Sequence, residues 1–425
     1  MSKTVSIHTL GCRVNMYESC AIAEQLKKNG FYVVKNENAD YYVVNTCAVT
    51  AESERKSRQL VRKCASKGKV LVIGCASQID LNYSDIDNVI YVGGNQDKLH
   101  VVQRIFDDVA GVKNDVNNVV SMEDAIYEEM TFGGDIDIFS ECRAFIKIED
   151  GCNGKCTYCI IPKCRGKVRS RDPERILNEA QCLVNRGYKE IILTGIEVGA
   201  YNKIPLYELV KRVSETKGLC RLRLGSLSPN IINEKFLETV SKLENFMPHF
   251  HLSLQSCSDS VLGAMKRPYR KDEIYKRVDL IRQYFPNCQI SADIIVGFPN
   301  ESQKDFDETL DAIKELGLFH LHSFPYSERK GTAAAEMKES VPRAIRNERN
   351  LRLISESDII KDKILQNKTN VTFEVLVEKI QNGFAFGHTR EFFEAKFIDC
   401  GFSVGDIVNI KVLNYENGIV NGQVI

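Results

Sequence analysis

The sequence predicts an α/β protein in three parts, because three different patterns follow one another along its 425 residues. A chain of this length exceeds what one hydrophobic core usually supports. Buried strands alternate with helices near the N-terminus, six further strands alternate with helices in the middle, and short strands of alternating apolar and polar residues follow. We therefore expect an N-terminal open parallel α/β domain over residues 1–118, a linker over 119–141, a central six-unit partial (β/α) barrel over 142–366 and a small C-terminal antiparallel β-barrel over 367–425.

The N-terminal part has the order strand, helix, strand, helix, strand, which is typical of an open parallel sheet. Its strands are the apolar runs TVSIHT, YYVVNT and KVLVIG. The first helix is expected from about Tyr17 to Lys28, where Asn29 and Gly30 end it, and a basic helix is expected over residues 51–67.

One cysteine comes directly after each of these strands. Cys12, Cys47 and Cys75 are 35 and 28 residues apart in the chain. Because the carboxyl ends of parallel strands lie along one edge of a sheet, where such folds bind ligands, we expect the three thiols to lie close together. The alternative is three unrelated buried cysteines, which requires that all three fall at the same point of the βα unit by chance.

The middle part contains six apolar runs separated by helical stretches. Six units are too few for a closed eight-stranded barrel, so we expect a partial barrel that is open on one side. The strands are AFIKI, EIILTG, RLRLGS, FHLSLQS, ISADIIVGF and FHLHSFPYS. The helices are expected over residues 172–186, 206–216, 231–243, 271–284, 301–316 and 342–364.

Three more cysteines lie in the segment DGCNGKCTYCIIP, after the first barrel strand. Cys152, Cys156 and Cys159 are thus placed at the edge that carries active sites in such barrels. Zinc sites and electron-transfer iron–sulfur sites normally take four ligands. A four-iron cluster held by three cysteines leaves one iron open to a substrate or cofactor. Cys164 is near enough in sequence to be the alternative fourth ligand.

This segment resembles the signature of the radical S-adenosylmethionine (SAM) enzymes, and a six-unit partial barrel is also the fold of that family. The resemblance implies a [4Fe-4S] cluster on the three cysteines, with SAM bound to its open iron and Tyr158 beside the SAM adenine. Reductive cleavage of SAM then yields a 5′-deoxyadenosyl radical. Weaker matches after the later strands imply further SAM contacts at Gly195, Glu197, Ser226, Gln255 and Val296.

The order of the three domains resembles the methylthiotransferases within that family, in which the C-terminal barrel is TRAM-like. This resemblance implies that Cys12, Cys47 and Cys75 hold a second [4Fe-4S] cluster, whose open iron binds the sulfur to be transferred. It also implies the chemistry. One SAM methylates that sulfur, and a second supplies the radical that removes hydrogen from C2 of an adenine, where the methylthio group is inserted.

Local motifs resemble most the branch that acts on N6-threonylcarbamoyladenosine at position 37 of tRNA. These motifs are TLGCRVNMYES, NTCAVT, KSRQLVRK, LTGIEVGAY and FPYSERKGTAA. The branch that acts on N6-isopentenyladenosine more often has GCQMN at the first cysteine, where this chain has GCRVN. One departure from the family pattern is Cys257, which stands where glycine is usual.

Three alternatives stay open. The same chemistry could act on N6-isopentenyladenosine in tRNA, or on an aspartate of ribosomal protein S12. The net charge of −2 over residues 367–425 keeps the protein substrate open, although small barrels of this kind often bind oligonucleotides. The third alternative is an iron–sulfur electron carrier without catalysis.

Basic residues gather locally, although 57 basic and 57 acidic residues leave no net charge. Residues 151–171 carry six basic residues and no acidic one, and residues 52–69 have a net charge of +5. We expect residues 165–171, 55–69 and 266–271 to contact phosphates of a tRNA anticodon loop, although a charge run is also typical of a solvated face. A flavodoxin- or ferredoxin-type electron donor and a monomeric chain are expected as well.

Several classes of protein are disfavoured. The 15 cysteines are odd in number and scattered, unlike a disulfide framework. The beginning, MSKTVSIHTLGC, lacks the apolar core of a signal peptide, and no apolar run approaches the roughly 20 residues of a membrane span, so we expect a cytoplasmic protein. Motifs for nucleotide triphosphates are absent from the sequence. The pairs His249/His251 and His320/His322 could bind a metal ion or simply line the barrel.

Overall fold

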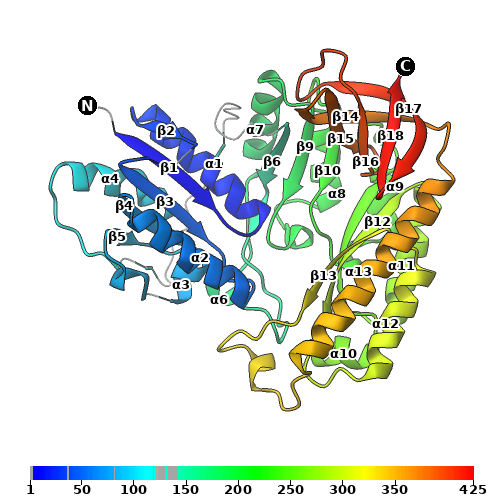
Figure 1. Ribbon diagram of the computed structural model, residues 1–425, viewed down its shortest axis with the longest axis horizontal. Helices are drawn as coiled ribbons and strands as arrows, with labels where there is room; N and C mark the ends of the chain where they lie inside the picture. Colours follow the sequence, from blue (N-terminus) through cyan, green and yellow to red (C-terminus); the bar gives the residue numbers. More distant parts are fainter. Residues whose placement is uncertain are drawn as a thin grey trace.

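The computed structural model describes residues 3–35, 38–80, 82–117, 119–120, 122, 130–132 and 142–425. In Figure 1 the N-terminal domain lies at the left, the partial barrel in the centre and the small C-terminal barrel at the upper right. Most of the expected linker over residues 119–141 lies outside the described residues. Among the helices of the described ranges, none combines the length and the hydropathy of a membrane span.

The N-terminal domain is built on five parallel strands in the order β2-β1-β3-β4-β5. The three expected strands are its centre, and the strands at its edges are only three and four residues long, too short for a periodic signal. The elements are β1 (Thr4–Thr9), α1 (Arg13–Lys28), β2 (Tyr32–Val34), β3 (Tyr41–Thr46), α2 (Ala51–Ala65), β4 (Lys69–Gly74), α3 (Cys75–Ile79), β5 (Val89–Val92) and α4 (Val101–Val109).

Helix α1 begins at Arg13, directly after Cys12, and not near Tyr17 as expected. The side chain of Asn15 explains the earlier start. Its Nδ2 donates to the carbonyls of Leu10 (2.8 Å) and Thr46 (2.9 Å), so tertiary contacts hold the first turn. A local hydrophobic pattern carries no signal for such contacts.

The central part is the expected partial barrel of six parallel strands. Its two sheets, β10-β9-β6 and β11-β12-β13, are joined by the bridges Leu222–Phe246 and Leu227–Leu252. Strands β6 and β13 are therefore its two free edges. The strands are β6 (Arg143–Lys147), β9 (Glu190–Thr194), β10 (Arg221–Leu224), β11 (His249–Gln255), β12 (Gln289–Val296) and β13 (His320–Pro325).

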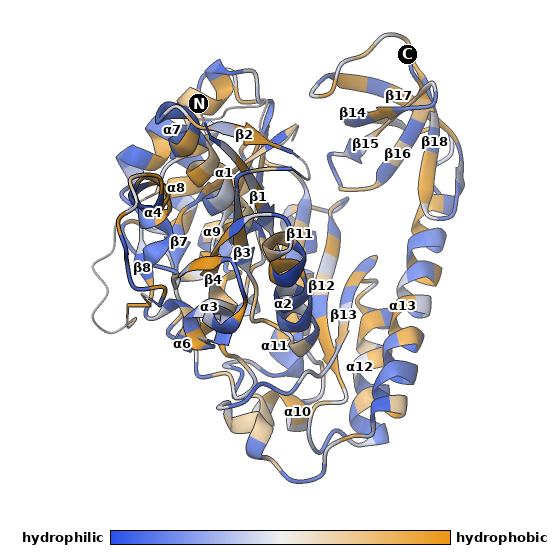
Figure 2. Ribbon diagram, turned by 60° about the vertical axis from the view of Figure 1, so that its left-hand side comes forward, coloured by the Kyte–Doolittle hydropathy of each residue, from blue (hydrophilic) through white to orange (hydrophobic). Residues whose placement is uncertain are grey.

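Helices separate these strands close to where they are expected. The exception is the helix expected over residues 231–243, which is shorter because a 3-10 turn precedes it and Asn233 caps it by accepting the N–H of Phe236 (3.0 Å). The helices are α7 (Pro173–Asn185), α8 (Leu206–Ser214), α9 (Glu234–Val240), α11 (Lys271–Tyr284), α12 (Gln303–Glu315) and α13 (Arg343–Gln366). Figure 2 shows that buried strands such as β4 consist mainly of hydrophobic residues, whereas helix α2 is largely hydrophilic.

Short elements follow the first barrel strand and were not expected. They are β7 (Glu149–Asp150), which pairs with β8 (Arg169–Ser170), the five-residue helix α6 (Ile161–Arg165), and α10 (Asp259–Ala264) further along. Helix α6 packs against α3 of the N-terminal domain.

The C-terminal part is a closed barrel of five strands, β14-β15-β16-β18-β17. Its neighbouring strands are antiparallel except β16 and β18, which run parallel. Gly387 lets two strands approach closely, since a Cβ there would lie 1.8 Å from the carbonyl oxygen of Leu376. The strands are β14 (Thr372–Gln381), β15 (Phe384–Thr389), β16 (Glu394–Ile398), β17 (Ile407–Glu416) and β18 (Ile419–Val424).

The C-terminal barrel covers the amino-terminal end of the central strands. Arg223 on β10 donates to the carbonyls of Thr389 (2.9 Å) and Arg390 (3.0 Å), and its guanidinium also pairs with Glu190 (3.0 Å). The Phe392 ring stacks on His249 of β11 at 4.6 Å. These contacts leave the opposite, carboxyl-terminal end of the strands for the cysteine segment.

A buried ionic network joins the N-terminal domain to the central barrel. Glu18 of α1 accepts from Lys147 on β6 (2.9 Å) and Arg165 on α6 (3.0 Å), and it also pairs with Lys98. Arg165 in turn donates to Asp150 (2.9 Å). Burial alone would raise the pKa of Glu18, but the three cations hold it well below its usual value.

This network corrects one expectation from the sequence. Arg165 and Arg171 were expected to contact tRNA phosphates, but both side chains are buried, and Arg171 pairs with Glu179 at 2.8 Å. A run of basic residues does not indicate which members face solvent, so their internal partners could not be predicted from the run. Arg165 and Arg171 are structural cations.

Removal of the Glu18 charge is expected to destabilise the protein strongly. Glu18→Gln leaves Lys98, Lys147 and Arg165 buried with one carboxylate fewer, which should cost about 3–5 kcal/mol of unfolding free energy. Chemical denaturation under anaerobic conditions measures this loss. Glu52→Gln is the matched control, because Glu52 pairs with Arg55 on the surface of α2 and its loss should change little. An equal response of the two variants would contradict the role of Glu18.

Candidate active site

The first three cysteines meet at the carboxyl edge of the N-terminal sheet. Cys12, Cys47 and Cys75 follow β1, β3 and β4, which are neighbours in that sheet. The charges of Cys12 and Cys75 act on the pKa of Cys47, which places all three sulfurs near one another. Gly11 permits this approach: its φ is +94°, and a Cβ there would lie 2.6 Å from the sulfur of Cys47.

Polar and charged groups surround the sulfur of Cys75. Its pKa falls to about 5, first because the Cys164 thiol hydrogen-bonds to it, and also because Arg165 and Lys98 lie near. Burial raises the pKa of Cys12 and of Cys47. A thiolate is the form of cysteine that binds metals, and this environment favours it at Cys75.

The sequence left Cys164 open as a fourth metal ligand beside Cys152, Cys156 and Cys159, and the structure shows where its thiol lies. Its thiol is fully buried on α6 and bonds to Cys75, which belongs to the N-terminal trio and not to the trio of its own segment. Asn95 Nδ2 donates to its carbonyl at 2.7 Å. Cys164 therefore lies between the two trios, as a buried thiol beside one of them.

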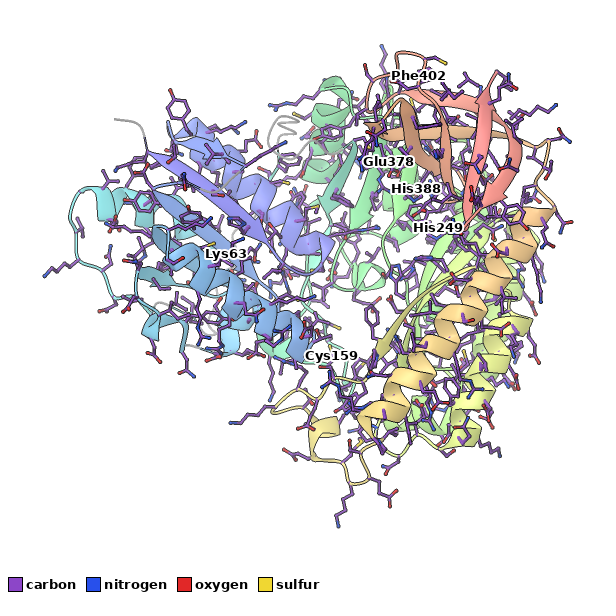
Figure 3. All side chains as sticks on the ribbon, viewed as in Figure 1. Lys63, Cys159, His249, Glu378, His388 and Phe402 are labelled. Carbon is purple, nitrogen blue, oxygen red and sulfur yellow. The ribbon has the colours of Figure 1, made fainter. Side chains whose placement is uncertain are left out.

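The second trio lies at the carboxyl end of the barrel strands, where the N-terminal domain meets the barrel (Cys159 in Figure 3). Cys152, Cys156 and Cys159 are half-buried. A Cβ on Gly154 would lie 3.1 Å from the sulfur of Cys152 and 3.8 Å from that of Cys156, so both thiols turn toward the same loop. Burial raises the pKa of Cys159 to about 12, and the charges of Cys156 and Cys152 add to this effect.

Two residues beside this trio were missed as site residues. Arg267 donates from Nη1 to the sulfur of Cys156 (3.2 Å) and from Nε to Tyr269 (2.7 Å), although the sequence had suggested a phosphate contact for residues 266–271. Glu149 is buried under Gly195 and accepts the N–H of Glu197. Burial raises the pKa of Glu149 to about 8, helped by Asp150 and Glu197. Its signal was the pair of acidic residues just before the first cysteine of the segment.

The other expected SAM contacts share this edge of the barrel. They follow or end the strands β9, β10, β11 and β12. Glu197 is half-buried, and burial raises its pKa. Tyr158 packs edge-on against Phe298 with ring centroids 6.5 Å apart. The positions are Gly195 and Glu197 after β9, Ser226 after β10, Gln255 at the end of β11 and Val296 at the end of β12.

Cys257 and the two histidine pairs belong to neither cysteine trio. Cys257 is fully buried, and burial raises its pKa to about 12. His251 and His322 come from different pairs and meet at Asp293, with nitrogen–oxygen distances of 3.0 and 3.5 Å. His249 instead stacks on the C-terminal barrel, so the two pairs do not form the two strand-face sites that their spacing suggested.

Two parts of the chain match known protein families. Residues 146–313 match the Radical SAM superfamily, and residues 4–88 match the uncharacterized protein family UPF0004. The fold resembles that of the radical SAM methyltransferase TsrM from Kitasatospora setae, with a TM-score of 0.60 over 91% of this chain and 77% of that chain, at 13% identity.

Relatives that match over nearly their whole length identify a more specific family within this superfamily. The threonylcarbamoyladenosine tRNA methylthiotransferase MtaB of Bacillus subtilis is 36% identical, and that of Thermotoga maritima is 34% identical; the matches cover 99% of this chain and 96% of each relative. A tRNA-2-methylthio-N(6)-dimethylallyladenosine synthase of Clostridium botulinum is 34% identical over the same shares. The chain belongs to the radical SAM tRNA methylthiotransferases.

Proposed function

We propose that this protein attaches a methylthio group to C2 of N6-threonylcarbamoyladenosine at position 37 of tRNA. The observation that carries the proposal is the presence of two separate three-cysteine sites, one on each domain, linked by α6. One such site would account for the formation of the radical but not for the insertion of sulfur. The second provides a place for the sulfur.

The two trios fit iron–sulfur clusters better than single metal ions. Thiolate sulfur is the ligand that iron–sulfur clusters require. Three ligand atoms on one ion lie close together, yet among the described residues only His251, Asp293 and His322 bring three such atoms within 4.8 Å of one another. In each trio, therefore, at least two of the three sulfurs lie farther apart than 4.8 Å. Cys12, Cys47 and Cys75 would hold one [4Fe-4S] cluster, and Cys152, Cys156 and Cys159 the other.

The chain positions these groups for chemistry at an unactivated carbon. When bound, the clusters and SAM would supply the electron, the radical and the activated sulfur that substitution at C2 requires. Tyr158, Gly195, Glu197, Ser226, Gln255 and Val296 would bind SAM at the barrel edge. Arg267 would orient Cys156 through the contact at 3.2 Å, and the buried Glu149 would fix the backbone of Glu197.

A tRNA anticodon loop is the partner that this geometry suits. A base in that loop is already unpaired enough to turn into a pocket. Helix α2 presents exposed cations for the phosphates, among them Lys63, which is labelled in Figure 3. These are Arg55, Lys56, Arg62 and Lys63 on the helix, and Lys67 lies just after its end. We further propose a flavodoxin- or ferredoxin-type reductant, a monomeric chain and a cytoplasmic location, where tRNA is modified.

The threonylcarbamoyl substrate is favoured by the two MtaB relatives named above, together with the GCRVN motif at the first cysteine. The dimethylallyladenosine enzyme at 34% identity keeps isopentenyladenosine as the second candidate. An aspartate of ribosomal protein S12 has no counterpart among these relatives. A non-catalytic electron carrier would not cleave SAM after reduction, so release of 5′-deoxyadenosine by the reduced protein excludes it.

Iron content tests the two sites. Anaerobic reconstitution should give about eight irons per chain, four for each cluster. Cys75→Ala should retain about four irons, whereas the control Cys164→Ala should retain about eight, because the Cys164 thiol is a neighbour and not a ligand. Colorimetric iron and sulfide analysis measures both. A wild-type plateau near four irons would contradict the two-cluster assignment.

Nucleoside mass spectrometry tests the substrate. In a strain that lacks this gene and any paralogue, tRNA should contain N6-threonylcarbamoyladenosine without its 2-methylthio derivative. Restoration of the gene should restore that derivative, and a Cys156→Ala copy should not. Persistence of the derivative in the deletion strain would exclude the proposed substrate.

A further inference from the structure

Arg13 extends from the N-terminal domain toward the inner face of the barrel. It is the first residue of α1, directly after Cys12, and its guanidinium carbon lies 5.5 Å from the ring centroid of Phe145 on β6. Its charge also interacts with those of Glu190 on β9 and Asp293 on β12, so Arg13 lies near strands from both sheets of the barrel.

The guanidinium of Arg13 is available to a ligand. Within the part of the chain that the structure describes, it makes no hydrogen bond and no ion pair, and the side chain is exposed to solvent. The other arginines nearby are engaged: Arg143 pairs with Glu378 (3.5 Å), and Arg223 with Glu190 (3.0 Å).

The barrel strands near Arg13 carry a cluster of polar side chains. Asp293 on β12 accepts from His251 on β11, and it lies 3.5 Å from a nitrogen of His322 on β13. Ser291 holds the other ring nitrogen of His251 at 2.7 Å. A hydrocarbon placed against the guanidinium of Arg13 and these groups would desolvate them without giving them partners, which is unfavourable.

The two candidate substrates differ in the group that would enter this space. A threonylcarbamoyl substituent carries a carboxylate and a hydroxyl, whereas a dimethylallyl substituent is a hydrocarbon. Arginine binds carboxylates through two parallel N–H bonds. Arg13 also adjoins Cys12, so a group bound to it lies near the site proposed for the sulfur.

We propose that Arg13 binds the carboxylate of the threonylcarbamoyl group and thereby selects this substrate over dimethylallyladenosine. This inference rests on the proposed function and deepens it. Arg13 is a specificity-determining residue, and His251, Asp293 and His322 form a polar cluster on strands near it.

Binding of synthetic anticodon stem–loops tests the inference. One loop carries N6-threonylcarbamoyladenosine, a second carries the same group with a carboxamide in place of the carboxylate, and a third carries dimethylallyladenosine. The reconstituted wild-type protein should bind the first about 30- to 100-fold more tightly than the second, the value of a charged hydrogen-bond pair. Arg13→Gln should reduce this ratio to about threefold or less, and Arg13→Lys should give an intermediate ratio because lysine lacks the planar fork.

Controls separate recognition from structural damage. Arg62→Gln removes an exposed arginine of α2 and should leave the ratio between the loops unchanged, whatever its effect on overall affinity. Arg13→Gln should keep about eight irons per chain. If Arg13→Gln loses iron, the ratio of the affinities of Arg13→Lys for the two loops decides the test instead. All measurements are repeated with EDTA, since loss of the wild-type preference on chelation would assign it to a metal ion at His251, Asp293 and His322.

Two outcomes overturn the inference: an unchanged ratio in both Arg13 variants, or a preference that requires a metal ion. Failure of the proposed function looks different. In that case the wild-type protein would methylthiolate the dimethylallyl loop and not the threonylcarbamoyl loop. If it modifies the threonylcarbamoyl loop while Arg13→Gln discriminates as well as the wild type, the proposed function stands and the role of Arg13 does not.

Discussion

Glu18 is buried where the N-terminal domain meets the central barrel, and its carboxylate faces three cations from separate parts of the chain. Such cations are tolerated in an interior only when they are paired. The network therefore constrains how α1 lies against β6 and α6. Because α1 follows Cys12 and α6 follows Cys159, the same constraint sets one cysteine trio relative to the other.

The site depends on this constraint because the proposed reaction needs two metal centres and one base in a single space. Asp150 shares Arg165 with Glu18 and is the first residue of the segment that carries the second trio. Cys164 and Arg165 lie on α6 beside Cys75, so this five-residue helix contacts the first trio while it continues from the second. The C-terminal barrel covers the other end of the strands, which leaves the side between β6 and β13 for the N-terminal domain and a substrate.

The fold could be predicted from the sequence where apolar residues form regular runs, or where a residue follows directly after a strand. Six barrel strands stood out as apolar runs, and Cys12, Cys47 and Cys75 could be brought together because parallel strands end at one edge. Interactions between distant segments carried no such signal. Arg165 and its neighbours read as a surface charge run because their partner Glu18 lies far away in the chain, and Glu149 and Arg267 are recognised only when the barrel closes around the cysteines.

The most direct test of the two-site account is an anaerobic reaction of the reconstituted protein with tRNA that carries N6-threonylcarbamoyladenosine. The reaction contains a low-potential reductant and SAM whose methyl group is deuterated. Mass spectrometry should find a methylthio group with three deuterium atoms on the adenine, together with 5′-deoxyadenosine. Formation of 5′-deoxyadenosine without a labelled methylthio product on any tRNA would contradict the account, because the barrel trio would then work without the sulfur site.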